Sequence, residues 1–264
     1  MLTYPNIDPV LFSLGPFQLR WYSLAYLIGI MGPIWIFRKT FRNVFKCTFD
    51  DCLNYVTYLV IGVIIGGRLG YVLFYDFLDF LRDPMMIVAI WRGGMSYHGG
   101  ALGCIVSTIL FARHKGISAL MLLDILAIGS TVGIGLGRIA NFINGELYGR
   151  VTTSMFGMVF PGGGALPRHP SQLYEAFFEG FVLFCLLWMA RRWLTLKPGV
   201  LGGMYLILYG IFRFFIEFFR QPDAHIGFVL GTFSLGQVLC IVEICVGMGV
   251  IWVLRKRNAL KKSA

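Results

Sequence analysis

Polar side chains gather in residues 137–149, where a long apolar run comes to its end. The stretch contains Arg138, Asn141, Asn144 and Glu146. The first three follow i, i+3, i+6 spacing, so a continuing helix brings them to one side. The planar fork of an arginine suits a phosphate group, and asparagine adds neutral hydrogen-bond donors. The simpler alternative is a helix end with asparagine caps and an arginine that reaches the membrane interface.

Other polar residues interrupt or border the apolar runs of this chain. Tyr209, Arg213 and Glu217 are spaced i, i+4, i+8, which places them on one helix face. Buried ionisable residues in membrane spans are costly, and they mark functional sites or structural ion pairs. Arg213 with Glu217 fits such a pair, and His98 fits an interfacial histidine bonded to a neighbouring helix. The remaining candidates at span ends are Tyr22, Arg68 and Arg220.

The chemistry of these residue types is specific when they are taken together. Two or three arginines in a lipid-accessible pocket bind an anionic headgroup such as a phosphodiester. A neutral imidazole accepts a proton near pH 7, and arginine stabilises a phosphate leaving group. Arg138, Arg213 and His98 are therefore the candidate catalytic residues of a lipid-modifying transferase. An anion transporter and a non-catalytic lipid-binding scaffold are the alternatives, although a transporter site belongs at the membrane midplane between repeated halves.

Composition indicates a membrane protein. The chain has 264 residues, of which 57% are hydrophobic and 14% are charged, whereas a soluble domain carries about 25% charged residues. The net charge of +10 is spread over short clusters between apolar runs, a distribution that argues against nucleic acid as a partner. The six cysteines show no spacing typical of a metal site, so neither a metal ion nor a cofactor is expected.

Seven apolar runs are long enough to be considered as membrane helices. Their limits are residues 21–37, 53–74, 93–112, 117–142, 171–190, 199–219 and 233–254. The connections after the first, third and fifth runs and the C-terminal tail hold 14 of the 23 lysine and arginine residues. Counting positive residues then places the N-terminus in the periplasm and the C-terminus in the cytoplasm. The candidate site residues lie toward the periplasmic leaflet in this topology.

The expected fold is an all-α integral membrane protein with seven transmembrane helices in one domain, residues 1–264. Residues 1–20 contain Pro5, Pro9 and Pro16 and are interpreted as an irregular lead. The longest polar connection, at about 143–170, is expected to form a small periplasmic segment. Glu175 and Glu179 follow it, and they are interpreted as a packing or capping pair near the outer start of the fifth span.

Four motifs in this order resemble those of the prolipoprotein diacylglyceryl transferases, and the similarity extends from about Ile7 to the basic tail. The motifs are SYHGG at 96–100, GRIANFINGELYG at 137–149, RHPSQLYE at 168–175 and FFRQPD at 218–223. The sequence departs from the family pattern at Ser23, Tyr97 and Ala140. Each departure adds bulk without removing a polar group, so it affects local packing more than activity.

The resemblance implies a bacterial inner-membrane enzyme whose active site faces the periplasm. Such an enzyme moves the diacylglyceryl group of phosphatidylglycerol to the lipobox cysteine in the signal peptide of a prolipoprotein, and it releases glycerol phosphate. His98 corresponds by motif position to the family's essential histidine, and Arg138 to the arginine that binds phosphatidylglycerol. The further functional positions that the resemblance implies are Tyr22, Asn141, Glu146, Gly149, Tyr209, Arg213 and Glu217.

Overall fold

The computed structural model describes residues 2–15, 17–221, 228–229 and 233–263, and most of them are helical. The chain divides into two compact units. One comprises residues 34–123 and is called the 34–123 unit below. The other combines residues 1–33 with 124–264 and is called the main unit. Each unit is described by itself.

Two helices, α3 (Phe49–Phe74) and α5 (Tyr97–Lys115), form the centre of the 34–123 unit. Glycines permit their close packing, because a Cβ atom on Gly66 or Gly99 would overlap the backbone of the opposite helix. The helix α2 (Arg38–Asn43) precedes this pair. Three short helices connect α3 to α5, namely α4 (Phe77–Arg82), η1 (Pro84–Ile87) and η2 (Ile90–Arg92).

Capping residues explain why α3 and α5 begin at other positions than the apolar runs predict. Helix α3 begins four residues early because Thr48 and Asp51 form a capping box, in which the Asp51 amide lies 3.2 Å from the Thr48 hydroxyl. Helix α5 begins at Tyr97 instead of residue 93. Its cap is Ser96, whose hydroxyl accepts a hydrogen bond from the Gly99 amide at 3.3 Å.

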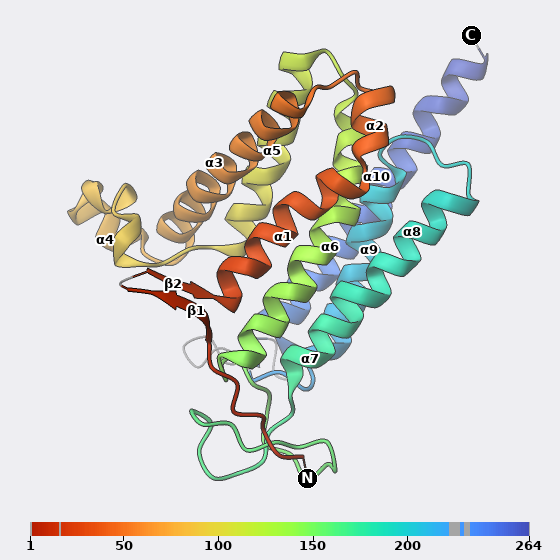
Figure 1. Cartoon of the computed structure of the whole chain (residues 1–264). Coiled ribbons are helices and arrows are strands. Elements are labelled where there is room, and N and C mark those ends of the chain that lie inside the picture. The colour runs from red at the N-terminus through yellow and green to blue at the C-terminus, as the bar shows by residue number, and fades with distance from the viewer. Residues whose placement is uncertain (1, 16, 222–227, 230–232, 264) are drawn as a thin grey trace. The chain divides into compact units, whose positions relative to one another are not determined.

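The main unit consists largely of long helices (Figure 1). They are α1 (Trp21–Ile36), α6 (Ala119–Ile143), α7 (Ser171–Glu175), the π-helix η3 (Ala176–Val182), α8 (Leu183–Trp193), α9 (Val200–Ile216) and α10 (Leu235–Ser263). Elements α7, η3 and α8 follow one another without interruption. π-Helical segments inside α-helices are rare overall, but those that occur are often found at functional sites.

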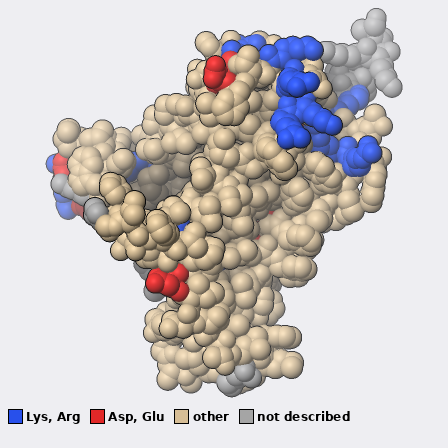
Figure 2. Space-filling view, viewed as in Figure 1, with Lys and Arg blue, Asp and Glu red and all other residues tan. Residues whose placement is uncertain are grey.

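The helices confirm a multi-pass membrane protein at the level of length and composition. Among the described residues, four helical segments are long and apolar enough to cross a membrane: Phe49–Phe74, Ala119–Ile143, Ser171–Trp193 and Leu235–Lys256. Helices α1 and α9 are apolar but shorter. Helix α5 joins neither group, because glycines, hydroxyl residues and a basic last turn lower its hydropathy. On the face shown in Figure 2, charged residues occupy only small patches of the surface.

Residues 10–15 and 17–20 form a β-hairpin, so the expectation of an irregular N-terminal lead is wrong there. Strand β1 (Val10–Leu14) pairs antiparallel with β2 (Phe17–Arg20). Apolar and polar residues alternate from Phe12 to Leu14 and along β2, and Gly15 at the turn has φ +59°. A second, shorter hairpin joins β3 (Phe228–Val229) to β4 (Phe233–Ser234) in front of α10.

Residues 144–170, between α6 and α7, fold over a small apolar cluster at the end of the main unit. Phe142, Met158 and Phe160 are buried there. Tyr4 from the N-terminal segment closes the cluster, since its hydroxyl lies 2.8 Å from the Phe142 carbonyl oxygen. The Tyr4 hydroxyl also lies 3.0 Å from the Ile143 carbonyl oxygen, so these contacts fix the backbone directly after Asn141.

At the opposite end of the main unit, Asp124 of α6 caps the start of α9. Its carboxylate accepts hydrogen bonds from the Gly199 and Gly202 amides at 2.7 and 2.8 Å, and the residue is buried.

Replacing Asp124 with alanine should lower the free energy of unfolding by about 1–3 kcal/mol, because it leaves buried helix amides without an acceptor. Denaturant titration in detergent measures this loss. Asp124→Asn keeps one acceptor oxygen and should lose less, and equal stability of the alanine and native proteins would refute the capping role.

Candidate active site

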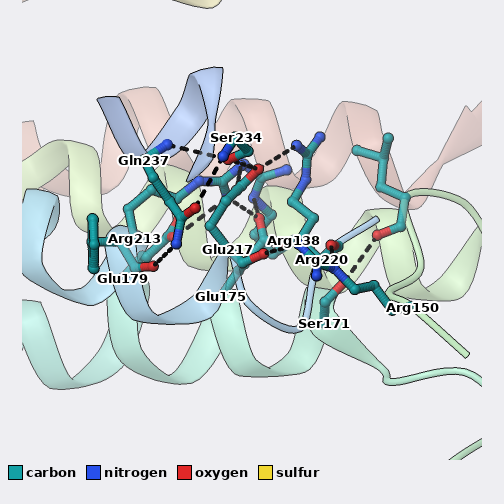
Figure 3. Close-up of polar contacts among 12 residues, drawn as sticks. Arg138, Arg150, Ser171, Glu175, Glu179, Arg213, Glu217, Arg220, Ser234 and Gln237 are labelled. Carbon is teal, nitrogen blue, oxygen red and sulfur yellow. Dashed lines mark hydrogen bonds and ion pairs between the residues drawn. The ribbon is translucent and has the colours of Figure 1, made fainter. Parts of the chain in front are cut away.

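Arg138 projects from α6 toward two other helices of the main unit. Its Nε lies 2.8 Å from Oε2 of Glu175, at the end of α7. The same carboxylate oxygen lies 2.8 Å from Nη1 of Arg213 in α9. One oxygen of Glu175 thus bridges two guanidinium groups that come from helices far apart in the sequence (Figure 3).

Glu175 and Glu179 are the most deeply buried charged residues of this network. Both side chains are 0% exposed. The π-helix η3 begins directly after Glu175 and contains Glu179, and Nη1 of Arg213 lies 3.4 Å from Oε1 of Glu179. The sequence interpretation of these acids as a packing or capping pair missed their ion pairs with arginines. A signal was present, since two carboxylates one turn apart inside an apolar span are too costly to leave unpaired.

A third carboxylate, Glu217, extends the network beyond the end of α9. Its Oε2 lies 3.3 Å from Nη2 of Arg213, and its Oε1 lies 3.7 Å from Nη1 of Arg220. Ser234 donates a hydrogen bond to the same Oε1 at 3.1 Å, and Gln237 accepts one from the Ser234 amide at 3.0 Å (Figure 3). Three arginines and three glutamates therefore alternate through the network, which lets their buried charges compensate one another.

Arg138 and Arg213 differ in whether their terminal nitrogens are available to bind a ligand. Both terminal nitrogens of Arg213 are committed to carboxylates. Arg138 is anchored through Nε alone, and among the described residues no hydrogen bond or ion pair engages its two terminal nitrogens. Its side chain is 20% exposed. Arg138 thus presents an open, oriented pair of donors, the arrangement in which arginine binds an anion with two oxygens.

A second polar cluster of the main unit is centred on Glu146. Oε1 of Glu146 accepts hydrogen bonds from the Tyr22 hydroxyl at 2.7 Å, from Asn141 at 3.0 Å and from Asn144 at 3.4 Å. Asn141 also donates to the Tyr22 hydroxyl. Asn141 and Asn144 of the predicted set thus meet at one carboxylate together with Tyr22 from α1, whereas Arg138 pairs with Glu175 instead. Gln172, which the sequence reading did not single out, donates to the Glu146 carbonyl oxygen at 2.6 Å.

Gly149 lies where three segments of the main unit meet. Its amide donates to the His169 carbonyl oxygen at 2.8 Å, and a Cβ atom there would lie 2.9 Å from that same oxygen. Any larger residue would push the segments apart. Arg150 donates from Nε to the Arg220 carbonyl oxygen at 2.8 Å. This junction ties the 144–170 connection to the end of α9, so Gly149 acts on the site through the backbone.

His169 is the histidine that lies beside this junction. Its Nδ1 is 3.3 Å from the Tyr174 hydroxyl, and its ring packs against Phe219 with centroids 5.1 Å apart. Burial lowers the pKa of His169 below its ordinary value, which favours the neutral form of the ring. Tyr209 is the remaining predicted residue of α9. Its side chain is buried, and its ring stacks on that of Tyr205 with centroids 5.7 Å apart.

Two predicted site residues belong to the 34–123 unit. His98 lies in the first turn of α5, and its side chain is exposed. Arg68 of α3 is buried, and it donates to the carbonyl oxygens of Met86, Gly93 and Gly94. These contacts hold the segment that leads into α5. The acceptors are backbone groups of an irregular connection, which is why residue types alone did not reveal them.

The predicted residues thus form two clusters in the main unit, with Arg138, Arg213, Glu217 and Arg220 in one and Tyr22, Asn141, Asn144 and Glu146 in the other. In the last motif, Pro222 and Asp223 lie outside the described residues. Among the described residues, no group of three or more histidines, cysteines and acidic residues is placed to hold a metal ion. The arrangement can bind an anion at Arg138 and hydroxyl groups at Glu146.

Comparison with known proteins identifies a family model and close relatives. The model described as prolipoprotein diacylglyceryl transferase matches residues 9–253. Three bacterial proteins named phosphatidylglycerol–prolipoprotein diacylglyceryl transferase are among those similar to this chain. The protein of Rickettsia felis is 49% identical over 95% of this chain and 98% of its own length. The proteins of Geobacter sulfurreducens and Brucella anthropi are 47% and 44% identical, over 97% and 95% of this chain and 99% and 93% of their own lengths.

Proposed function

Because this chain belongs to the prolipoprotein diacylglyceryl transferase family, we propose that it transfers the diacylglyceryl group of phosphatidylglycerol to a prolipoprotein. This reaction is the first step of bacterial lipoprotein maturation. The acceptor is the thiol of the lipobox cysteine in the signal peptide. The substrates reach the enzyme in the cytoplasmic (inner) membrane, where surrounding lipids supply phosphatidylglycerol.

The reaction forms one bond and breaks one. The cysteine sulfur attacks the carbon of the diacylglyceryl group that is bonded to a phosphate oxygen. A carbon–sulfur bond forms, and the bond between that carbon and the phosphate oxygen breaks. Glycerol phosphate leaves with the bonding electrons, and the thiol proton passes to a base. The protein therefore needs a group that activates the thiol and a group that stabilises the phosphate as it departs. His98 and Arg138 are the proposed groups.

The observation that carries this proposal is the one-sided anchoring of Arg138. Glu175 holds Nε at 2.8 Å, and this contact orients the two terminal nitrogens for the oxygens of a phosphodiester. A fixed donor pair stabilises developing charge without reorganising during the reaction. Partial exposure of Arg138 leaves space for a lipid headgroup to approach.

Arg213 and Glu175 are proposed as positioning residues for Arg138. Residue type and spacing alone favour a direct role of Arg213 at the phosphate. Its terminal nitrogens are instead engaged by Glu175, Glu179 and Glu217, which supports an indirect role. In this arrangement Arg213 fixes Glu175, and Glu175 fixes Arg138. The network is buried, so removal of any one charge leaves its partners uncompensated.

The Glu146 cluster is the proposed site for the glycerol headgroup. A carboxylate accepts hydrogen bonds from hydroxyl groups, and the amides of Asn141 and Asn144 can donate to a phosphate or hydroxyl oxygen. Tyr22 holds Glu146 in place through its hydroxyl. Tyr209, Glu217 and Arg220 stay as proposed substrate-binding residues at the end of α9. Arg68 is proposed to act through the segment it holds in front of His98.

Incubation of the purified protein with phosphatidylglycerol and a lipobox peptide tests the proposal directly. The peptide should gain the mass of a diacylglyceryl group on its cysteine, and a peptide with serine in that place should gain none. Flux of an anionic solute without a covalent product would favour a transporter. Binding of phosphatidylglycerol that survives loss of His98, without any product, would favour a scaffold.

We also propose seven transmembrane helices, α1, α3, α5, α6, the continuous segment from α7 to α8, α9 and α10. The distribution of basic residues supports a periplasmic N-terminus and a cytoplasmic C-terminus. A cysteine introduced at exposed Met155 should react with a membrane-impermeant reagent added from the periplasm. A cysteine at Arg42 should react only after the membrane is opened, with the native cysteines replaced in both variants. Labelling of residue 155 from the cytoplasm would overturn this topology.

Replacing Glu175 with glutamine should lower kcat/KM for phosphatidylglycerol by about 10²-fold, since misplacing a catalytic group by about 1 Å has an effect of this size. Glutamine keeps the size of the side chain but removes the charge that anchors Arg138 and Arg213. Glu175→Asp keeps the charge on a shorter side chain and should recover part of the activity. Steady-state kinetics in mixed micelles provide the measurement.

Glu179→Gln is the matched control, because Glu179 contacts Arg213 but not Arg138. It removes a buried charge from the same π-helix and should reduce kcat/KM less than Glu175→Gln. Thermal unfolding identifies variants that have lost stability instead of alignment. Equal losses in the two folded variants would show that the network acts as one unit, without a special role for Glu175.

A further inference from the structure

The β1–β2 hairpin has one apolar face. Its register pairs Phe12 with Leu19 and Leu14 with Phe17, and Ser13 with Gln18 between them. Side chains alternate between the two faces of a strand, and directly paired residues share a face. Phe12, Leu14, Phe17 and Leu19 therefore project together, and these four residues are called the hairpin apolar face. Ser13 and Gln18 project from the opposite face.

Among the described residues of the main unit, none covers the hairpin apolar face. Phe12, Leu14, Phe17 and Leu19 are 60%, 69%, 78% and 43% exposed. Exposed large apolar side chains are common when they are scattered singly, but four on one face of a two-stranded ribbon form a contiguous patch. Such patches mark surfaces that contact lipid or another protein.

The connection to α1 identifies what covers this patch. Strand β2 ends at Arg20 and α1 begins at Trp21, without a residue between them. Trp21 also ties the hairpin base to the helix, because its Nε1 donates to the Asp8 carbonyl oxygen at 3.1 Å. Tyr26 and Leu27, one to two turns into α1, are exposed and face lipid in a membrane helix. Because α1 is proposed to span the membrane, its first residue lies at the membrane surface, and the hairpin that is joined to it lies there as well.

We propose that the hairpin is an interfacial membrane anchor, whose apolar face lies among the acyl chains of the leaflet in which α1 begins. Ser13 and Gln18 then face the headgroups and water, and Arg20 lies at headgroup depth beside Trp21. This is the β-hairpin counterpart of an amphipathic helix that lies in the interface plane. A tryptophan at the helix start fits the same depth. The inference rests on the proposed membrane span of α1, but not on the reaction that the protein catalyses.

Depth-dependent fluorescence quenching in vesicles of phosphatidylglycerol and phosphatidylcholine tests the anchor. The full chain, with its native cysteines replaced, receives one environment-sensitive label at residue 14, 17, 13 or 18. Labels at Leu14→Cys and Phe17→Cys should show blue-shifted emission and stronger quenching by nitroxide-labelled lipids. Labels at Ser13→Cys and Gln18→Cys, the matched controls on the opposite face, should be quenched more strongly by aqueous iodide.

Three results would overturn the proposal. Equal quenching at all four positions would show that the hairpin does not lie with one face in the lipid. Shielding of residues 14 and 17 that disappears when the protein is diluted among vesicles would assign the face to a second copy of this chain. Shielding that arises only after addition of a lipobox peptide would assign it to the polypeptide substrate. Transfer activity of each labelled variant verifies that the protein is folded.

Discussion

Replacing Arg138 with alanine is expected to lower kcat/KM for phosphatidylglycerol by on the order of 10³-fold, the upper range for loss of one preorganised donor group at a developing oxyanion. The structure leaves both terminal nitrogens of Arg138 available while Glu175 holds Nε. Alanine removes the two donors and their charge together. The rate of diacylglyceryl transfer to a lipobox peptide, followed by mass spectrometry, measures the loss.

Arg138→Lys separates the charge from the geometry. Lysine keeps a positive charge but cannot occupy two phosphate oxygens while a carboxylate anchors it. Loss of one hydrogen bond to a charged group costs about 1.5–3 kcal/mol, so transfer should fall by about 10- to 100-fold. Arg192→Lys, at the exposed end of α8, is the matched control and should retain native turnover. Native turnover of Arg138→Lys would show that a point charge suffices.

The long elements of the fold were predictable because apolar runs and helix spacing are local properties. Each of the seven predicted runs overlaps a helix. Their ends were less predictable, since Thr48 and Ser96 set the starts of α3 and α5 through side-chain caps. The hairpin of β1 and β2 escaped prediction because Pro5, Pro9 and Pro16 suggested that residues 1–20 are irregular. Its signal was the pair of short alternating segments on either side of Gly15.

The candidate site was predictable only where its residues lie within a few positions of one another in the sequence. Asn141 and Asn144 converge on Glu146 as their spacing indicates, and Arg213 pairs with Glu217 one turn later. The bridge from Glu175 to Arg138 and Arg213 joins three helices, and spacing along a single chain does not encode such a contact. For the same reason, the contacts of Arg68 with backbone carbonyl groups could not be predicted from the sequence, because they depend on how the connection between α3 and α5 folds.

His98→Gln should keep phosphatidylglycerol binding but lower transfer at pH 7 by about 10²–10⁴-fold, the usual contribution of a general base. A cysteine thiol has a reference pKa of about 8.5, so only a few per cent is thiolate near pH 7. Of the four histidines, His98 is the one predicted inside a span near the outer leaflet. It is proposed to accept the thiol proton, directly or through water, while Arg138 binds the phosphate. Lipid binding and transfer are measured separately on the same variant.

The pH dependence distinguishes a base from a residue that only orients the site. As the pH rises toward the thiol pKa, more thiolate forms without help, so the ratio of native to His98→Gln rates should shrink between pH 7 and 8.5. His169→Gln is the control, because burial lowers the pKa of His169 and its ring is held by Tyr174 and Phe219. Its rate relative to the native protein should not change with pH. If the folded His98→Gln variant stays equally impaired at pH 8.5, or loses lipid binding, His98 orients the site and is not the base. If the activity of His169→Gln recovers as the pH rises, His169 is the base instead.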